Sequence, residues 1–203
     1  MGVKYKLRDD CFLVGNNCAV GWVYKMLLQL PYETPFVWNY FTHEQMFRLS
    51  RVWDDIDWKA QDWTPREVGS FKEMQTLYDG FFATRSNFPI EMWWHLKFHA
   101  NDGQCVKMLL PHLDLRDGAE GHGKLARRVE RFLKALETKQ PVFAFTRNYD
   151  DKHWTEEQER IISEDPRCVL CDFEGKAIPA KWMASSVVLP KLLERGFIKA
   201  VEE

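Results

Sequence analysis

The sequence has little net charge and no long apolar run. Its 28 basic and 30 acidic residues leave a formal net charge of −2, so no strong positive field favours nucleic acid as a partner. No apolar run approaches the ~20 residues of a membrane-spanning helix. The opening MGVKYKLRDD is charged and polar, and the apolar stretch after it is too short for a secretory signal. We therefore expect a cytoplasmic protein with no membrane span and no nucleic-acid partner.

Several cofactor motifs are also missing. The sequence contains no G-x-x-x-x-G-K-[ST], no G-x-G-x-x-G and no H-E-x-x-H, so nothing local supports a nucleotide cofactor or a zinc protease. Its five cysteines form no disulfide framework, which fits a reducing compartment. There is no internal repeat and no Gly/Ser-rich linker. We expect one domain over residues 1–203 that needs no cofactor.

Aromatic residues, in contrast, are abundant. The chain has nine tryptophans and fourteen phenylalanines. Large apolar side chains dominate protein interiors, so most of these rings are expected in the core. The alternative is a surface on which sugar rings or a flat ligand stack.

The hydrophobic pattern alternates between short apolar runs and helical periods. Strands are expected at 11–15, 90–100, 141–147 and 167–173, an extended piece at 34–41, and helices at 19–30, 43–56, 119–138 and 155–165, with a further helix start at Thr64-Pro65. Short apolar strands between helices favour an α/β fold, with a three-layer, mostly parallel sheet and helices on both faces. In such sheets ligands bind beyond the carboxyl ends of the strands.

Cys18 lies at one of these strand ends, after Asn16 and Asn17, where a helix is expected to begin. A helix N-terminus lowers a thiol pKa, and amides of residues 19 and 20, with the Asn17 side chain, could bind an oxyanion. Asn16 is a candidate substrate contact. The alternative is a small buried core residue, which is common for free cysteine.

A cysteine nucleophile needs an imidazole as its base. His99 is the best placed candidate, because it ends an apolar strand and is followed by Asn101 and Asp102, which are candidate substrate contacts. His95 lies on the same face of that strand. His153 is a weaker candidate, in the loop after residues 141–147.

Arginines are candidates for holding a phosphate or carboxylate, because the guanidinium fork matches these anions. Arg128 and Arg131 lie on the basic helix, and Arg147 follows the strand at 141–147. The alternative is salt bridges to nearby Asp and Glu. Cys168 and Cys171 form a single C-x-x-C, but they lie in an expected strand, where residues three apart face opposite sides, so no metal site is expected.

Four short blocks resemble a known group of proteins: NNC at 16–18, YETPF at 32–36, PI at 89–90 with KFHA at 97–100, and ARRVER at 126–131. Together they resemble bacterial exopolysaccharide or capsule biosynthesis proteins and a related group labelled papain-like cysteine peptidases. The resemblance implies a cysteine after the first strand and a histidine after a middle strand, which are Cys18 and His99 here. It implies modification of surface polysaccharide more than peptide cleavage.

Two functions follow as hypotheses. The first is a Cys–His enzyme of surface-polysaccharide biosynthesis, with Cys18 as nucleophile and His99 as base, that carries out acyl transfer or ester or thioester hydrolysis on a sugar or its carrier, with coenzyme A as a candidate acyl donor. The second is a non-catalytic glycan-binding or assembly module, in which arginines hold a phosphate or uronate. A third reading places all aromatics in the core and leaves function to a protein partner.

Overall fold

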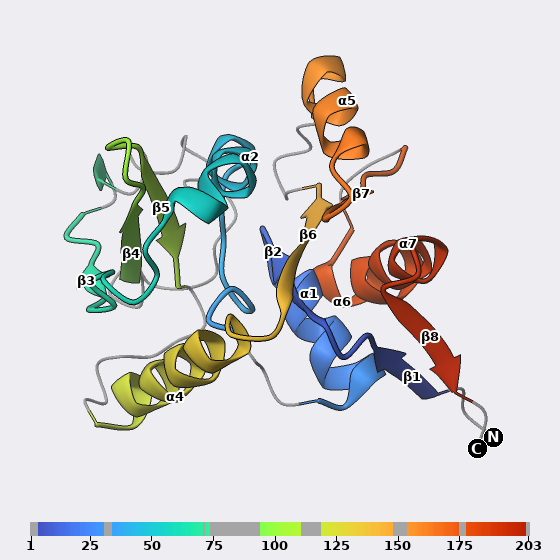
Figure 1. The fold of residues 1–203 in the computed structure, drawn as a ribbon, viewed down its shortest axis with the longest axis horizontal. Helices are drawn as coiled ribbons and strands as arrows, with labels where there is room; N and C mark the ends of the chain where they lie inside the picture. The colour runs from blue at the N-terminus through green and yellow to red at the C-terminus, as the bar shows by residue number, and fades with distance from the viewer. Residues whose placement is uncertain are drawn as a thin grey trace.

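The computed structural model describes residues 4–30, 34–70, 72–73, 94–110, 119–147, 154–174 and 178–201. Within these ranges the chain forms a mixed α/β structure with three small sheets (Figure 1). The α/β class is therefore confirmed. The described strands do not join into a single sheet, however, and only one of the three sheets is parallel.

The parallel sheet has the order β2-β6-β7 and consists of Cys11–Gly15, Gln140–Thr146 and Cys168–Cys171. Both of its faces are buried. Phe12 and Phe143 pack into one hydrophobic cluster, whereas Leu13 and Val142 pack into a second one on the opposite face. Burial on both faces explains why these strands read as continuous apolar runs in the sequence.

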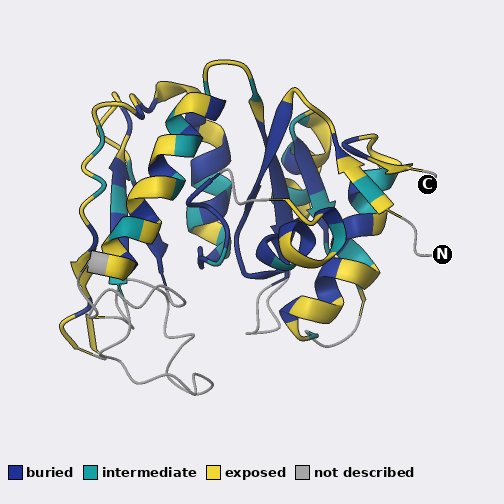
Figure 2. Ribbon diagram, turned by 90° about the horizontal axis from the view of Figure 1, so that it is seen from below, coloured by how far each residue is buried: buried dark blue, intermediate teal, exposed yellow. Residues whose placement is uncertain are grey.

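Helices accompany this sheet in chain order. Their bounds are α1 Ala19–Trp22, the π-helix η1 Val23–Leu28, α2 His43–Val52, the 3-10 helix η2 Trp53–Asp55, α4 Ala119–Ala135, α5 Glu156–Glu164, α6 Ala180–Met183, the π-helix η5 Ala184–Val188 and α7 Leu189–Glu194. Residues of α1, α6 and α7 belong to the second cluster, and residues of α2 and α4 belong to the first. Helices therefore lie on both faces of the parallel sheet (Figure 2).

Side-chain caps set two of the expected helix starts. Thr155 accepts a hydrogen bond from the backbone N–H of Gln158, and the Gln158 side chain accepts one from the N–H of Thr155. Thr42 accepts from the N–H of Gln45 at the start of α2. Such caps satisfy amides that have no partner within the helix.

The second sheet is antiparallel, with the order β3-β4-β5. It consists of Arg66–Glu67, Trp94–His99 and Cys105–Leu109. Leu96 and Phe98 on β4 point into the first cluster, so alternation turns His95, Lys97 and His99 to the other face. A third, two-stranded antiparallel sheet pairs β1, Lys4–Leu7, with β8, Ile198–Val201, near the chain ends (Figure 1).

The described aromatic rings are mostly core, as expected. Phe36, Trp53, Trp58 and Phe132 are all less than 7% exposed, and their ring centroids lie 4.5–5.9 Å apart. Such pairs contribute about 0.5–1.5 kcal/mol each beyond the area that they bury. Trp182 differs, because it is 66% exposed on α6.

Two local expectations are wrong, and one expected helix changes type along its length. Thr64-Pro65 starts no helix, because Asp62 accepts the N–H of Thr64 in a turn and the chain then enters β3. The extended piece at 34–41 is a series of turns and bends with one bridge, Tyr40 to Leu109. The helix expected at 19–30 is confirmed over residues 19–28, as α1 followed by the π-helix η1, and it ends at Gln29, which has φ 52°.

The single parallel sheet expected from the sequence is also corrected, because β4 pairs with β3 and β5 in the antiparallel sheet instead of joining β2-β6-β7. Residues 90–93 of the strand expected at 90–100 lie outside the described residues, as does His153.

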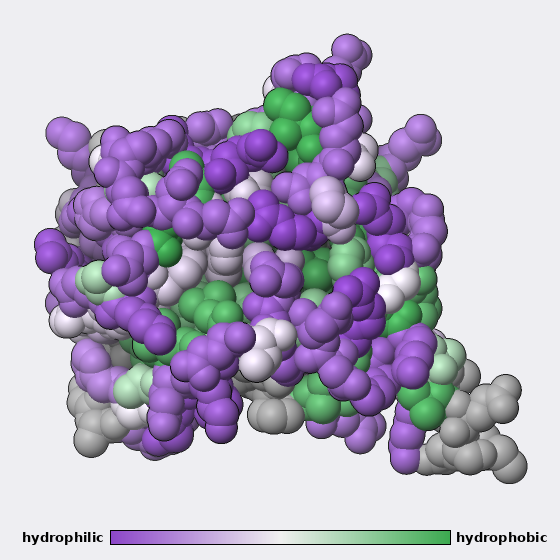
Figure 3. Space-filling view, in the orientation of Figure 1, coloured by the Kyte–Doolittle hydropathy of each residue, from purple (hydrophilic) through white to green (hydrophobic). Residues whose placement is uncertain are grey.

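No helix in the described ranges is both long enough and apolar enough to cross a membrane. On the face that Figure 3 displays, polar residues cover most of the surface and apolar residues show only in small areas between them.

Candidate functional site

The carboxyl edge of the parallel sheet carries the polar residues expected there. β2, β6 and β7 run in the same direction, and their ends are followed by Asn16, Arg147 and Asp172. The fold thus brings the loop that holds Asn16 and Asn17 next to the loop after β6, as the sequence indicated.

Asn16 joins two of these strand ends and is fully buried. Its side-chain amide donates to the carbonyl of Thr146 at 2.8 Å, and its Oδ1 accepts from the N–H and the hydroxyl of Thr146, both at 2.8 Å. Asn17 donates to the carbonyl of Arg147 at 3.2 Å and accepts from the N–H of Ala19 at 2.9 Å. Both asparagines therefore tie the chain to itself, and the amide of Ala19 expected to bind an oxyanion already donates within the loop.

Arg147 has no exposed surface. Its Nε lies 3.1 Å from Oδ1 of Asp172, and its guanidinium carbon lies 4.8 Å from the centroid of the Phe173 ring. Arginine is the cation best suited to such buried, stacked pairs. The anion that Arg147 holds is therefore a carboxylate of its own chain, as the salt-bridge alternative predicted.

Cys18 is 8% exposed and packs in the second cluster. Burial raises the pKa of its thiol to about 12, the direction that desolvation imposes on any group that becomes negative. It does precede α1, which continues directly into the π-helix η1. The expected low-pKa thiolate is therefore wrong, because desolvation outweighs the helix end.

His99 does not meet Cys18. Phe98, its neighbour on β4, points into the first cluster, and His99 faces the other way. Cys18 belongs to the second cluster, on the opposite face of the parallel sheet. The first cluster and the parallel sheet thus separate the two side chains.

Asn101 and Asp102 form the turn between β4 and β5. Gly103 follows with φ 85°, and Oδ1 of Asp102 accepts the N–H of Gln104 at 2.9 Å. An aspartate that bonds to the backbone two residues on is a typical turn residue. The Asn-Asp pair after His99 thus closes a hairpin.

Two further expectations concern the basic helix and the cysteine pair. Arg128 and Arg131 lie half-buried on α4, and neither lines the pocket described below.

Cys168 packs in the first cluster and Cys171 in the second, so the two thiols face opposite sides of β7, as the strand pattern predicted.

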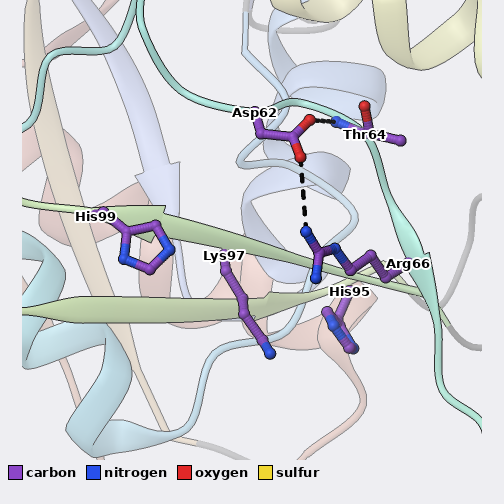
Figure 4. Close-up of a pocket in the computed structure, with 6 residues that line it drawn as sticks. All are labelled: Asp62, Thr64, Arg66, His95, Lys97 and His99. Atoms are coloured by element: carbon purple, nitrogen blue, oxygen red, sulfur yellow. Dashed lines mark hydrogen bonds and ion pairs between the residues drawn. The ribbon is translucent and has the colours of Figure 1, made fainter.

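A pocket of about 280 Å³ lies on the outer face of the antiparallel sheet. It is lined by Asp62, Thr64, Arg66, His95, Lys97 and His99 (Figure 4). The histidines and the lysine come from β4, where alternation turns them away from the core. Arg66 reaches the pocket from β3, directly across the ladder from His95.

Hydrogen bonds hold the rim of this pocket in place. Asp62 lies 3.8 Å from the Arg66 guanidinium and accepts the N–H of Thr64 at 2.9 Å, and the bond from Thr64 and the charge of Arg66 hold the pKa of Asp62 below its ordinary value. Gln61 bonds to both backbone groups of His99, at 2.7 and 3.1 Å. The backbone of His99 is therefore held in place, whereas its imidazole is exposed.

His95 is the buried member of the set, with 3% of its surface exposed. Neither of its ring nitrogens has a hydrogen-bond partner among the described residues. Burial lowers its pKa, and the positive charges of Lys97, Arg66 and Lys107 lower it further, against an opposing effect of Glu73. A neutral imidazole with one unused donor and one unused acceptor therefore lines a pocket with positively charged walls.

Of the residues that line this pocket, the sequence pattern predicted His99 as a functional residue and placed His95 on the same face, but it did not single out Lys97 or Arg66. The alternation of polar residues at 95, 97 and 99 within an apolar strand was a usable signal for Lys97, since it marks one solvent-facing side. Arg66 had no such signal, because its position depends on pairing with a strand 28 residues away.

Comparison of the chain with protein-family models, curated proteins and solved structures finds no match. The resemblance to polysaccharide biosynthesis proteins therefore stays a prediction. In the described part of the chain no group of three or more His, Cys, Asp or Glu could hold a metal ion.

Proposed function

We propose that this protein is a binding module that holds the anionic group of a small saccharide, a phosphate or a uronate, in the pocket on β3 and β4. One observation carries the proposal: Arg66, His95, Lys97 and His99 line the same pocket (Figure 4). This is the second of the two functions that the sequence suggested, with different residues in the binding role.

The charges around the pocket favour an anion. Arg66 offers a planar fork that matches a phosphate or carboxylate, and Lys97 offers a point charge. Lys107 adds a further positive charge, directly across the ladder from Lys97. Asp62 offsets part of this charge, and it can accept a hydrogen bond from a sugar hydroxyl.

The size and exposure of the site set the expected affinity. A pocket of about 280 Å³ lies just below the usual range of roughly 300–1,000 Å³ for ligand sites. Arg66 is exposed, so its charge is screened by water and salt. We expect a dissociation constant of the order of 0.1–1 mM at low ionic strength, weakening as salt is added.

The Cys–His mechanism lacks comparable support. The thiol of Cys18 is buried and neutral, and the protein core separates it from His99. Acyl transfer and the use of coenzyme A therefore remain predictions from the sequence. A role in surface-polysaccharide biosynthesis is part of the proposal and rests on the sequence resemblance, whereas a cytoplasmic location is proposed from the five cysteines without a disulfide framework.

Calorimetric titration with glucose 1-phosphate and with glucuronate tests the proposal. Lys97→Met removes one cation from the pocket, and Lys199→Met is the matched control, because Lys199 also faces a lysine across an antiparallel ladder but lies on β8. We expect binding to weaken about tenfold, the equivalent of about 1.4 kcal/mol, in Lys97→Met alone. Failure of both ligands to bind, or equal binding by the two variants, would refute it.

A further inference from the structure

The buried histidine of the pocket has a consequence for ligand choice. We infer that His95 takes up a proton when the ligand binds, and that this makes the pocket select a phosphate monoester over a carboxylate. The inference rests on the proposed function, since it concerns the same pocket.

The geometry of His95 carries the inference. His95 has 3% of its surface exposed, and both of its ring nitrogens lack a partner in the described structure. Leu109 lies directly across from it on β5 and offers no polar side chain. Buried polar groups are normally hydrogen-bonded, and an exception calls for a specific explanation. Each nitrogen exposes less than 1 Å², so ligand binding has to shift the His95 ring toward the pocket that it lines, where the ligand supplies the missing partner.

The charges around His95 explain why the proton arrives only with the ligand. Among the described residues, the groups that surround the ring or share its pocket are Arg66 on β3, Lys97 and His99 on β4, Lys107 on β5, and Asp62 and Glu73 outside the strands. Of these, Lys97, Arg66 and Lys107 oppose a positive imidazole, and Glu73 favours one. An added anion reverses this balance, because an opposite charge within a few ångströms favours the charged form.

A phosphate monoester shifts the balance further than a carboxylate does. It carries a charge of about −1.5 to −2 near neutral pH and presents three acceptor oxygens, whereas a carboxylate carries a single charge on two oxygens. The protonated ring offers two N–H donors in place of one. The proton comes from the solvent and is held by a ring nitrogen, and no bond of the ligand breaks.

The test measures proton uptake directly. Binding of glucose 1-phosphate is followed by calorimetry at about pH 7.5, where an ordinary histidine is mostly neutral, in PIPES and in Tris, which differ in their heat of ionisation. The difference between the buffers gives the number of protons taken up. We expect uptake of a large part of one proton with glucose 1-phosphate and clearly less with glucuronate.

His95→Gln keeps one donor and one acceptor but cannot titrate in this range, and His99→Gln is the matched control in the same pocket. We expect His95→Gln to abolish the uptake and to reduce the preference for phosphate about tenfold, the effect of one pKa unit of coupling. His99→Gln keeps the uptake. Uptake that persists in His95→Gln, or that is equal for both ligands, overturns the inference.

A measurement on the wild-type protein tests the inference without any variant, so it does not depend on whether His95→Gln folds. The ring carbon and nitrogen shifts of His95 in NMR spectra report its protonation, and they should move to the imidazolium values when glucose 1-phosphate is added. Ligand binding with the ring still neutral defeats this inference alone. Absence of binding by either ligand defeats the proposed function as well, so the two failures are distinguishable.

Discussion

Replacing Asn16 with alanine should destabilise the protein strongly, because this side chain ties the end of β2 to the end of β6. Three hydrogen bonds of 2.8 Å join it to Thr146, and both residues are fully buried. Each bond contributes about 1 kcal/mol, and each buried group left without its partner costs about 1–3 kcal/mol. We therefore expect Asn16→Ala to lower the free energy of unfolding by about 3 kcal/mol.

Urea denaturation followed by tryptophan fluorescence and circular dichroism measures this loss. In a chain of this size it corresponds to a fall in Tm of roughly 6–12 °C. Asn101→Ala is the control, since Asn101 is exposed in the β4–β5 turn and should change stability by less than about 0.5 kcal/mol. A loss below about 1 kcal/mol for Asn16→Ala, or equal losses for the two variants, would refute the structural role of Asn16.

Three other outcomes are expected. Arg147→Met leaves the Asp172 carboxylate without its buried cation and should cost about 3–5 kcal/mol in urea denaturation, of which the double change Arg147→Met with Asp172→Leu recovers a part; no recovery would contradict the pairing. Iodoacetamide at about pH 8 should label the half-buried Cys105 before Cys18 in the native protein, as read by mass spectrometry, because burial raises the pKa of Cys18 to about 12; the reverse order would restore Cys18 as a nucleophile. Burial also raises the pKa of Cys168 and Cys171 to about 12. Above the ordinary thiol pKa, the thiols of Cys18, Cys168 and Cys171 therefore keep their protons in the folded state, whereas the same thiols lose them in the unfolded chain. Stability is then full below the ordinary thiol pKa and should fall by up to about 1.4 kcal/mol per thiol and pH unit above about pH 8.5; a urea midpoint that is constant between about pH 8 and pH 9.5 in reductant would contradict this.

The elements that local pattern determines were accessible from the sequence. The expected strands at 11–15 and 141–147 are apolar over residues 11–15 and 141–145, and parallel pairing buries both of their faces. The four residues from Thr155 to Gln158 are enough to predict where α5 begins, because a helix cap depends only on neighbouring groups. The loops after these strands do come together at one edge of the sheet, as the topology of parallel strands requires.

Contacts between distant segments were not accessible in the same way. Nothing near Arg66 in the sequence indicates that it pairs with His95, and the same holds for β1 and β8 at the two ends of the described chain. The residue pattern around Thr64 fits a helix start as well as it fits a turn. The bond from its N–H to Asp62 and the pairing of β3 with β4 decide between them.

The sequence by itself determined the α/β class, the strand-end loops and the residues capable of chemistry, since these depend on local periodicity and residue type. Only the tertiary structure decided what those residues do. It buried Cys18 and Arg147. Desolvation keeps the Cys18 thiol neutral, and the Arg147 guanidinium forms an ion pair with Asp172. It placed His95 and Lys97 beside Arg66 on the face of β4 that does not meet the first cluster, because strand alternation and a remote pairing together shape the pocket. Burial and long-range pairing are properties of the whole fold, and no short stretch of the chain encodes them.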